Sequence, residues 1–236
     1  MTGQGAPEQV AVVTGTASGI GAAIARELTD RGWLVAGLDL QPSSAAALSV
    51  EVDMSDSAAV THAIRRVERE LGTPSSAVSA AGYYEMTLIS DITVDQWKRM
   101  LAVHLGGMVN LARAILPAMV AVGTGSLIAI TSELAIGGGA GDAHYAAAKG
   151  ALLGLVRSLA VEFAPQGVRV NAVAPGPTDT PLLAADSPWR EPAYLSTLPI
   201  GRLASPEEVA LCVAFLLNEG TFLVGETLNP NSGAVI

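Results

Sequence analysis

The sequence Thr14-Gly15-Thr16-Ala17-Ser18-Gly19-Ile20-Gly21 joins a short apolar run to a segment with helical periodicity. The run is Val10 to Val13, and after it Ile20, Ile24 and Leu28 recur every four residues. This order predicts a strand, a tight turn and a helix. Glycines let the backbone approach a pyrophosphate closely, and free N–H groups at a helix start favour its charge. Such a turn is also an ordinary loop feature, and no Gly-Lys-Ser/Thr follows it, which disfavours a P-loop.

Six more short apolar or β-branched runs follow, and helical periodicity recurs between them, for instance at Leu152, Val156 and Ala160. The alternation predicts an α/β, doubly wound (Rossmann) fold with a seven-stranded parallel sheet and helices on both faces. Ligands of such folds bind beyond the carboxyl ends of the strands, near the point where the strand order reverses. The expected strands are Val10 to Val13, Trp33 to Leu38, Leu48 to Val52, Ala77 to Ala80, Leu127 to Thr131, Val168 to Val173 and Glu226 to Leu228.

We expect residues 1–236 to form one domain, because doubly wound sheets of this length commonly do. The proline-rich stretch 176–200 carries bulky apolar side chains, and we interpret it as a substrate lid. These side chains would either form an apolar wall for the substrate or pack the loop itself. They are Leu182, Leu183, Trp189, Tyr194 and Leu195.

The chain has 13 Lys and Arg against 22 Asp and Glu, a formal net charge of −9, and the basic residues are scattered. This balance argues against a nucleic-acid partner. Uninterrupted apolar runs stay short of the ~18 residues of a membrane span, so no membrane partner is expected. Met1 to Gln9 lack the pattern of a secretory signal, and Cys212 is the only cysteine, which favours a cytoplasmic location. No motif predicts a metal site.

The second expected strand ends at Asp39, eighteen residues beyond Gly21. An acid at this position can accept hydrogen bonds from the adenosine ribose hydroxyls and would repel a 2′-phosphate. Residues 16–20, Leu40 and Gln41 include no Arg or Lys that could pair with that phosphate. NAD(H) is therefore expected over NADP(H). The alternative is that Asp39 only begins a turn.

Tyr145-Ala146-Ala147-Ala148-Lys149 places a phenol and an ammonium four residues apart on an expected helix, hence on one face. A nearby Lys⁺ lowers the pKa of a tyrosine from its reference of ~10, as general acid/base catalysis requires. The same spacing is common in surface pairs, so the surrounding sequence is needed to distinguish a catalytic pair from a surface pair.

From Val10 to Gly233 the chain resembles the short-chain dehydrogenase/reductase family, whose Thr-Gly-x-x-x-Gly-x-Gly motif is similar to Thr14 to Gly21. Bacterial 3-oxoacyl-carrier-protein reductases and alcohol or polyol dehydrogenases are the members it resembles most. The resemblance implies hydride transfer between NAD(H) and a small alcohol or carbonyl substrate. It also implies that Ser132 hydrogen-bonds the substrate oxygen and that Tyr145 gives or takes the proton of that oxygen. Lys149 would act with Tyr145 and bind the nicotinamide ribose.

The resemblance further implies a cofactor-binding set drawn from the glycine turn, the ends of several strands and the segment after the sixth strand. Its members are Gly15, Thr16, Ser18, Gly19, Ile20, Gly21, Asp39, Leu40, Asp53, Met54, Ala80, Ala81, Gly82, Tyr145, Lys149, Pro175, Gly176, Thr178 and Thr180. Some positions depart from the family. Only fourteen residues separate Asp39 from Asp53, so the helix between them should be much reduced. Ser79-Ala80-Ala81-Gly82 replaces Asn-Asn-Ala-Gly, which puts local strand support in doubt.

His104 occupies the position of the family's fourth catalytic residue, an Asn that joins the Lys to solvent through an ordered water. Histidine can donate and accept a hydrogen bond, so we hypothesise a substituted relay. The alternative is a helix histidine that is satisfied locally.

Two rival functions remain at this level. An NADPH-dependent 3-oxoacyl-carrier-protein reductase would favour a basic docking patch, against which Asp39 and the acidic balance argue. A non-catalytic dinucleotide-binding sensor would be expected to lack Tyr145 or Lys149, and both are present. The family resemblance also implies a homodimer or homotetramer, with Leu101 to Val122 and Ala146 to Phe163 as helices that could pair.

Overall fold

The computed structural model describes residues 9–236 and contains seven parallel strands in the order β3-β2-β1-β4-β5-β6-β7. The predicted doubly wound sheet is confirmed, and each strand end lies within two residues of its expected position. The expectation that Met1 to Gln9 contain no secretory signal concerns mainly residues 1–8, which lie outside the described residues. The strands are β1 Val10–Thr14, β2 Leu34–Asp39, β3 Leu48–Glu51, β4 Ser76–Ser79, β5 Gly125–Ile130, β6 Val168–Val173 and β7 Thr227–Leu228.

The strand order reverses at β1, which pairs with β2 on one side and with β4 on the other. Val12 lies opposite Ala36 in β2 and Ala77 in β4. Chain segments leaving β1 and β4 therefore diverge to opposite faces of the sheet and leave a crevice at their carboxyl ends.

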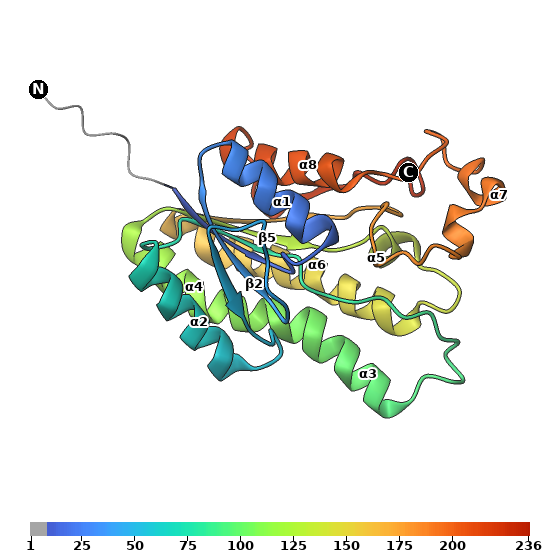
Figure 1. Ribbon diagram of the computed structural model, residues 1–236, viewed down its shortest axis with the longest axis horizontal. Helices are drawn as coiled ribbons and strands as arrows, with labels where there is room; N and C mark the ends of the chain where they lie inside the picture. Colours follow the sequence, from blue (N-terminus) through green and yellow to red (C-terminus); the bar gives the residue numbers. More distant parts are fainter. Residues whose placement is uncertain (1–8) are drawn as a thin grey trace, which may run out of the picture.

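Helices cover both faces of the sheet (Figure 1). Helices α1 (Gly19–Asp30) and α8 (Pro206–Asn218) lie on one face, and α2 (Ser57–Glu70), α4 (Gly107–Val122) and α6 (Ala143–Phe163) lie on the other. Each face has its own buried cluster, one around Ile24 and Leu28 and the other around Leu111, Ile115 and Leu152. The shorter helical segments are α3 Val94–Leu101, the π-helical η1 Ala102–Gly106, α5 Leu134–Gly137, the 3₁₀ segments η2 Ala164–Gln166 and η3 Pro188–Arg190, and α7 Pro192–Leu195.

Helices α3, η1 and α4 form one continuous helix, Val94–Val122. Within the described residues it is the one helix long and apolar enough to cross a membrane. Its apolar side chains Met108, Leu111 and Met119 belong to the core beneath the sheet. The composition is thus explained by packing, and it is weak evidence for a membrane span.

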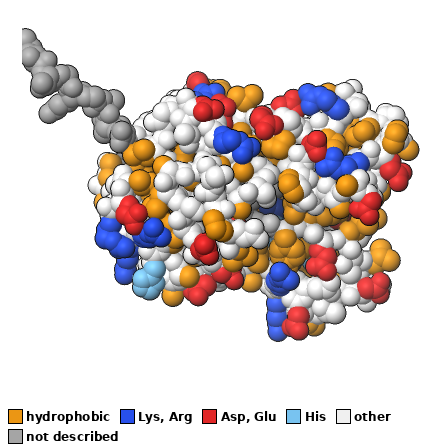
Figure 2. Space-filling view, in the orientation of Figure 1, with side chains coloured by type: hydrophobic (Ala, Val, Ile, Leu, Met, Phe, Trp, Pro, Cys, Tyr) orange, Lys and Arg blue, Asp and Glu red, His pale blue; other side chains and the backbone are white. Residues whose placement is uncertain are grey.

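The connection between β2 and β3 is short, as the spacing of Asp39 and Asp53 predicts. Residues 40–47 contain no helix. The Val52 N–H donates to the Asp39 carbonyl at 2.7 Å, which extends the pairing of the two strands beyond their assigned ends. Acidic and basic side chains are both spread over the visible face of the molecule rather than gathered into one basic surface (Figure 2).

Candidate active site

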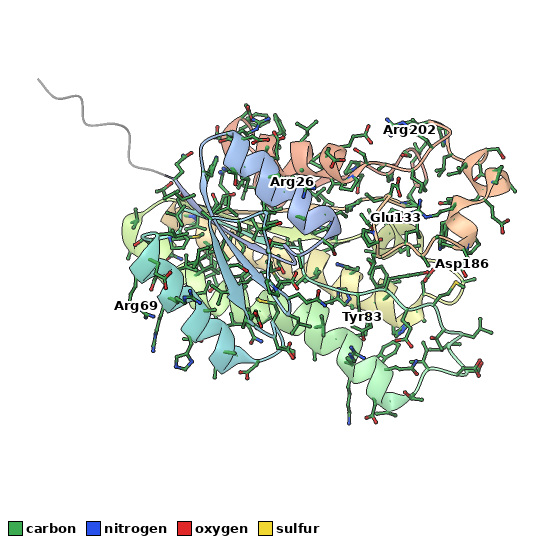
Figure 3. All side chains as sticks on the ribbon, in the orientation of Figure 1. Arg26, Arg69, Tyr83, Glu133, Asp186 and Arg202 are labelled. Carbon is green, nitrogen blue, oxygen red and sulfur yellow. The ribbon has the colours of Figure 1, made fainter. Side chains whose placement is uncertain are left out.

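A cleft lies at the carboxyl ends of the strands. Figure 3 shows Tyr83 and Glu133 on that side of the sheet, where α5 and α7 also lie. All four predicted catalytic residues line it. The lining comprises Ile20, Ala80, Gly82, Tyr83, Tyr84, His104, Ile130, Thr131, Ser132, Glu133, Leu134, Tyr145, Lys149, Pro175, Gly176, Pro177, Thr178, Thr180, Leu182, Leu183 and Trp189.

The glycine turn is packed so closely that larger residues do not fit. Gly15 has a φ of +76°, and a Cβ there would lie 2.9 Å from the Cα of Ala81. The Thr14 Oγ1 accepts hydrogen bonds from Ala80 N at 2.9 Å and Ala81 N at 2.8 Å. This hydroxyl joins the ends of β1 and β4, and it supplies the local strand support that the missing Asn amides had put in doubt.

Asp39 is fixed beside the same turn by two backbone hydrogen bonds. Its Oδ2 accepts from Ala17 N at 3.0 Å and its Oδ1 accepts from Gln41 N at 3.1 Å. The carboxylate therefore faces the loop between β1 and α1, where a dinucleotide's adenosine end lies in a fold of this kind.

The predicted cofactor set divides between the cleft and its surroundings. Ile20, Ala80 and Gly82 line the cleft, together with the predicted residues of α6 and of the segment after β6. Thr180 closes on the glycine turn, because a Cβ on Gly19 would lie 3.4 Å from its side chain. The other predicted residues lie outside the cleft lining; they are Gly15, Thr16, Ser18, Gly19, Gly21, Asp39, Leu40, Asp53, Met54 and Ala81.

Three of these outer residues differ in their surroundings. Leu40 is 70% exposed, and the Asp53 carboxylate accepts from the backbone and hydroxyl of Ser55, both at 2.8 Å. Met54 is buried, and its carbonyl accepts from the Asn110 side chain at 2.9 Å. Their environment is compatible with contact to an adenine at the rim of the cleft, which stays a prediction.

Tyr145 and Lys149 lie one turn apart on α6, and Ser132 lies two residues beyond β5. The Lys149 Nζ is 5.7 Å from the centre of the Tyr145 ring. Lys149 is buried and donates a hydrogen bond to the Ile130 carbonyl at 2.8 Å. The end of β5 thus fixes the Lys149 side chain by a hydrogen bond, and the Tyr145 phenol lies beside it in the cleft.

The charges of this pair differ from the expectation drawn from the sequence. Burial lowers the pKa of Lys149 to about 7. The pKa of Tyr145 is raised, first by desolvation and then by the Glu133 carboxylate, while the Ser132 hydroxyl partly opposes the shift. The expected lowering of the Tyr145 pKa by Lys149 is therefore wrong for this structure, because both groups are desolvated and the ammonium is directed to a backbone carbonyl.

His104 lies in the π-helical segment with its ring against Gly82, where a Cβ would collide with it. Its ring centre is 5.4 Å from that of Tyr145. Burial lowers the pKa of His104 to about 3, so the ring is neutral near neutral pH. Its Nε2 lies 2.9 Å from the Tyr83 carbonyl oxygen and 3.4 Å from the Tyr83 N, and a proton on Nε2 satisfies the shorter contact and leaves Nδ1 as an acceptor. This Nδ1 is buried and has no hydrogen-bond partner among the described residues.

The other two histidines lie outside the cleft. His144 is buried and stacks on Trp97 with ring centres 6.5 Å apart. His62 is exposed on α2.

Two buried acids, Glu133 and Asp142, lie near Tyr145 at the two ends of the segment that follows Ser132. The Glu133 Oε2 accepts from the Ser132 hydroxyl at 2.8 Å, and the Asp142 Oδ1 accepts from the Tyr84 hydroxyl at 2.7 Å. Burial raises the pKa of Glu133. The signal available in the sequence was an acid directly after the expected catalytic serine, but its contact depends on the turn that begins α5.

Known proteins with a similar sequence and fold agree with this architecture. The family model described as enoyl-(acyl carrier protein) reductase covers residues 15–234. The chain belongs to the short-chain dehydrogenase/reductase family. It is 38% identical to the cis-4-hydroxycyclohexanecarboxylate dehydrogenase of Sinomonas cyclohexanicum over 98% of both chains. It is 34% identical to the 3-oxoacyl-[acyl-carrier-protein] reductase FabG of Escherichia coli strain K12, over 95% of this chain and 96% of that one.

Two solved structures of the family share the fold closely. The aldohexose dehydrogenase of Thermoplasma acidophilum in ligand-free form has a TM-score of 0.90 at 30% identity, covering 96% of this chain and 93% of that one. The 3-ketoacyl-(acyl-carrier-protein) reductase of Brucella melitensis complexed with NADH has a TM-score of 0.90 at 25% identity, covering 98% of this chain and 100% of that one. The chain is accordingly an oxidoreductase of this family that binds a nicotinamide dinucleotide.

Proposed function

We propose that this protein is an NAD(H)-dependent oxidoreductase that interconverts a secondary alcohol and a ketone. The observation that carries the proposal is the meeting of Ser132, Tyr145 and Lys149 in one cleft, beside a glycine turn too tight for any larger residue. The bound dinucleotide supplies the position that accepts or donates hydride.

The residues of the cleft divide the remaining work. In oxidation, Ser132 hydrogen-bonds the substrate oxygen and Tyr145 takes its proton as the carbon loses hydride. Lys149 holds the nicotinamide ribose. His104 lies against the Tyr145 ring, and its free Nδ1 can accept a proton-relay hydrogen bond through water. Carbonyl reduction follows the same path in reverse.

The preference for NAD(H) over NADP(H) rests on Asp39. Its carboxylate is held by Ala17 N and Gln41 N, and a 2′-phosphate beside it would place two negative groups together. The related Brucella melitensis reductase is complexed with NADH, which supports the same cofactor for this chain.

An NADPH-dependent 3-oxoacyl-carrier-protein reductase is the second candidate, favoured by the 34% identity to relatives of that name. The acidic net charge of −9 and Asp39 speak against it. A non-catalytic dinucleotide-binding sensor is less well supported, because Ser132, Tyr145 and Lys149 all line the cleft.

Initial rates with NADH and NADPH on a panel of small ketones test these candidates together. We expect turnover with NADH, and a loss of about 100-fold or more in Tyr145→Phe. A preference for NADPH would contradict the cofactor proposal. Dinucleotide binding without any turnover would favour the sensor, and wild-type rates in Tyr145→Phe would remove Tyr145 from the reaction.

We also propose that one cytoplasmic domain, with 176–200 as a lid, assembles as a homodimer or homotetramer. Leu182, Leu183 and Trp189 from the lid line the cleft, whereas Tyr194 packs edge-on against Trp189 at 4.8 Å. A groove between α4 and α6, lined by Leu116, Leu159 and Phe163 among others, supports pairing of these helices across a two-fold axis. Light scattering tests the assembly, and a monomer would refute it.

A further inference from the structure

A buried carboxylate in the cleft has no role in the reaction proposed above. Glu133 is 6% exposed and lines the cleft directly after Ser132. The Ser132 hydroxyl donates to Glu133 Oε2 at 2.8 Å and accepts from Leu134 N at 3.2 Å. A serine hydroxyl has a single proton. While that proton is directed to Glu133, Ser132 cannot donate it to a substrate oxygen.

Besides Ser132, only the backbone N–H groups of Glu133 and Leu134 reach the Glu133 carboxylate among the described residues. In the part of the chain that the structure describes, Ser132 is the one side chain that hydrogen-bonds its carboxylate. The cleft wall is formed by apolar side chains of α5 and the lid, which are Leu134, Leu182, Leu183 and Trp189. A buried carboxylate in such a setting is stabilised by each donor that reaches it. A ligand with an apolar body and a donor group therefore fits this cleft.

We propose that Glu133 selects substrates that carry a hydrogen-bond donor, a hydroxyl or an ammonium, on the carbon next to the reacting carbinol. This inference rests on the proposed oxidoreductase function. The neighbouring donor replaces the Ser132 hydroxyl on the Glu133 carboxylate. The Ser132 proton is then free to bind the reacting oxygen, so the same contact that recognises the substrate also prepares the serine.

The reaction of a 1,2-diol balances without any further reactant. The carbinol C–H bond breaks and its hydride passes to NAD⁺, while the hydroxyl proton passes to the Tyr145 phenolate, which has first lost its own proton to solvent. The products are an α-hydroxyketone, NADH and one proton released to solvent. The second hydroxyl stays intact and serves only as the donor to Glu133.

The second acid strengthens the selection by charge. Asp142 is fully buried and accepts from the Tyr84 hydroxyl at 2.7 Å, and the Tyr84 ring lies edge-on to Tyr145 with centres 5.2 Å apart. Two acids near the reacting carbon disfavour a substrate with a carboxylate at the adjacent carbon. A 2-hydroxy acid is therefore expected to be a poor substrate.

The test measures kcat/KM with NAD⁺ at about pH 9, well above the usual pKa of a glutamate, because burial raises the pKa of Glu133. Substrates are cyclohexanol, cis- and trans-cyclohexane-1,2-diol and trans-2-aminocyclohexanol. We expect at least one donor-bearing substrate to exceed cyclohexanol by about tenfold or more, the discrimination that a hydrogen bond to a charged group provides. In Glu133→Leu this ratio should fall to near one, and in Glu133→Gln, which keeps the side-chain shape, it should fall severalfold.

Glu191→Gln is the matched control, because it removes a carboxylate from the exposed part of the lid and should keep the wild-type ratio. Equal kcat/KM for all substrates in the wild type would overturn the inference. A preference that persists in both Glu133 variants would overturn it too. Oxidation of cyclohexanol without diol preference leaves the proposed function intact, whereas no oxidation of any substrate with either dinucleotide refutes both.

Discussion

Replacing Lys149 by Met should change how the stability of the protein depends on pH. Burial lowers the Lys149 pKa from 10.5 to about 7 in the folded chain. Between these two values the unfolded chain binds this proton and the folded chain does not. The free energy of unfolding therefore rises with pH across this window, and the contribution is lost as the pH falls toward 7.

The size of the effect follows from the shift. One pKa unit corresponds to about 1.4 kcal/mol, and half of the lysine is already neutral near the folded-state pKa. From about pH 7 to about pH 9, wild type should gain about 2 kcal/mol relative to Lys149→Met. Urea unfolding at fixed protein concentration measures both proteins at each pH. Lys98→Met, which removes an exposed ammonium from α3, is the control. Its difference from wild type in the free energy of unfolding should change by less than about 0.5 kcal/mol over this pH range.

A difference between wild type and Lys149→Met that stays constant over this pH range would refute the reasoning. It would mean that Lys149 keeps its proton in the folded state despite burial. Loss of turnover in the same variant is expected but does not test the electrostatic argument, because it follows from any role of Lys149 in the cleft.

Three further substitutions test other parts of the site. Gly15→Ala forces a Cβ to 2.9 Å from the Ala81 Cα at a φ of +76°. The free energy of unfolding should therefore fall by about 1–3 kcal/mol in thermal unfolding, and the NADH affinity measured by calorimetry should also fall. Wild-type values for both would contradict the close packing around Gly15. His104→Ala should lower turnover, and His104→Asn should keep it near the wild-type value. The pH–rate profile of His104→Asn should match that of the wild type, because a pKa of about 3 keeps His104 neutral over the measured pH range. Full activity in His104→Ala would show that the ring serves packing alone. Asp39→Ala should reduce the ratio of kcat/KM for NAD⁺ over NADP⁺ by about tenfold, and an unchanged ratio would show that Asp39 only shapes its turn.

The elements of this fold could be predicted because their signals are local. Apolar runs such as Val168 to Val173 have the length and β-branching of buried parallel strands, and the Ile20, Ile24 and Leu28 repeat marks the buried side of α1. Tyr145 and Lys149 share a side of α6 for the same geometric reason. The strand ends were displaced by up to two residues, since pairing with a neighbouring strand, as at Asp39 and Glu51, decides where a strand stops.

The electrostatics of the cleft could not be predicted in this way. Spacing on α6 places the Lys149 ammonium near Tyr145, but the Ile130 carbonyl that receives its hydrogen bond comes from a strand nineteen residues earlier. Desolvation and then Glu133 raise the pKa of Tyr145, and Glu133 approaches because β5 ends and α6 begins at the same edge of the sheet. Desolvation is a property of the packed site, and no single segment of sequence carries it.

The relay proposed for His104 depends on burial, because burial keeps the imidazole neutral. An amide side chain offers one donor group and one acceptor, whereas a charged imidazole offers two donors. The low pKa of His104 keeps its ring neutral, with Nε2–H directed to the Tyr83 carbonyl and Nδ1 left to accept. The ring also needs more room than an amide, and Gly82 provides that room beside β4. The departure at His104 is thus coupled to Gly82, so a side chain at position 82 should disturb the proposed relay even though it touches no substrate.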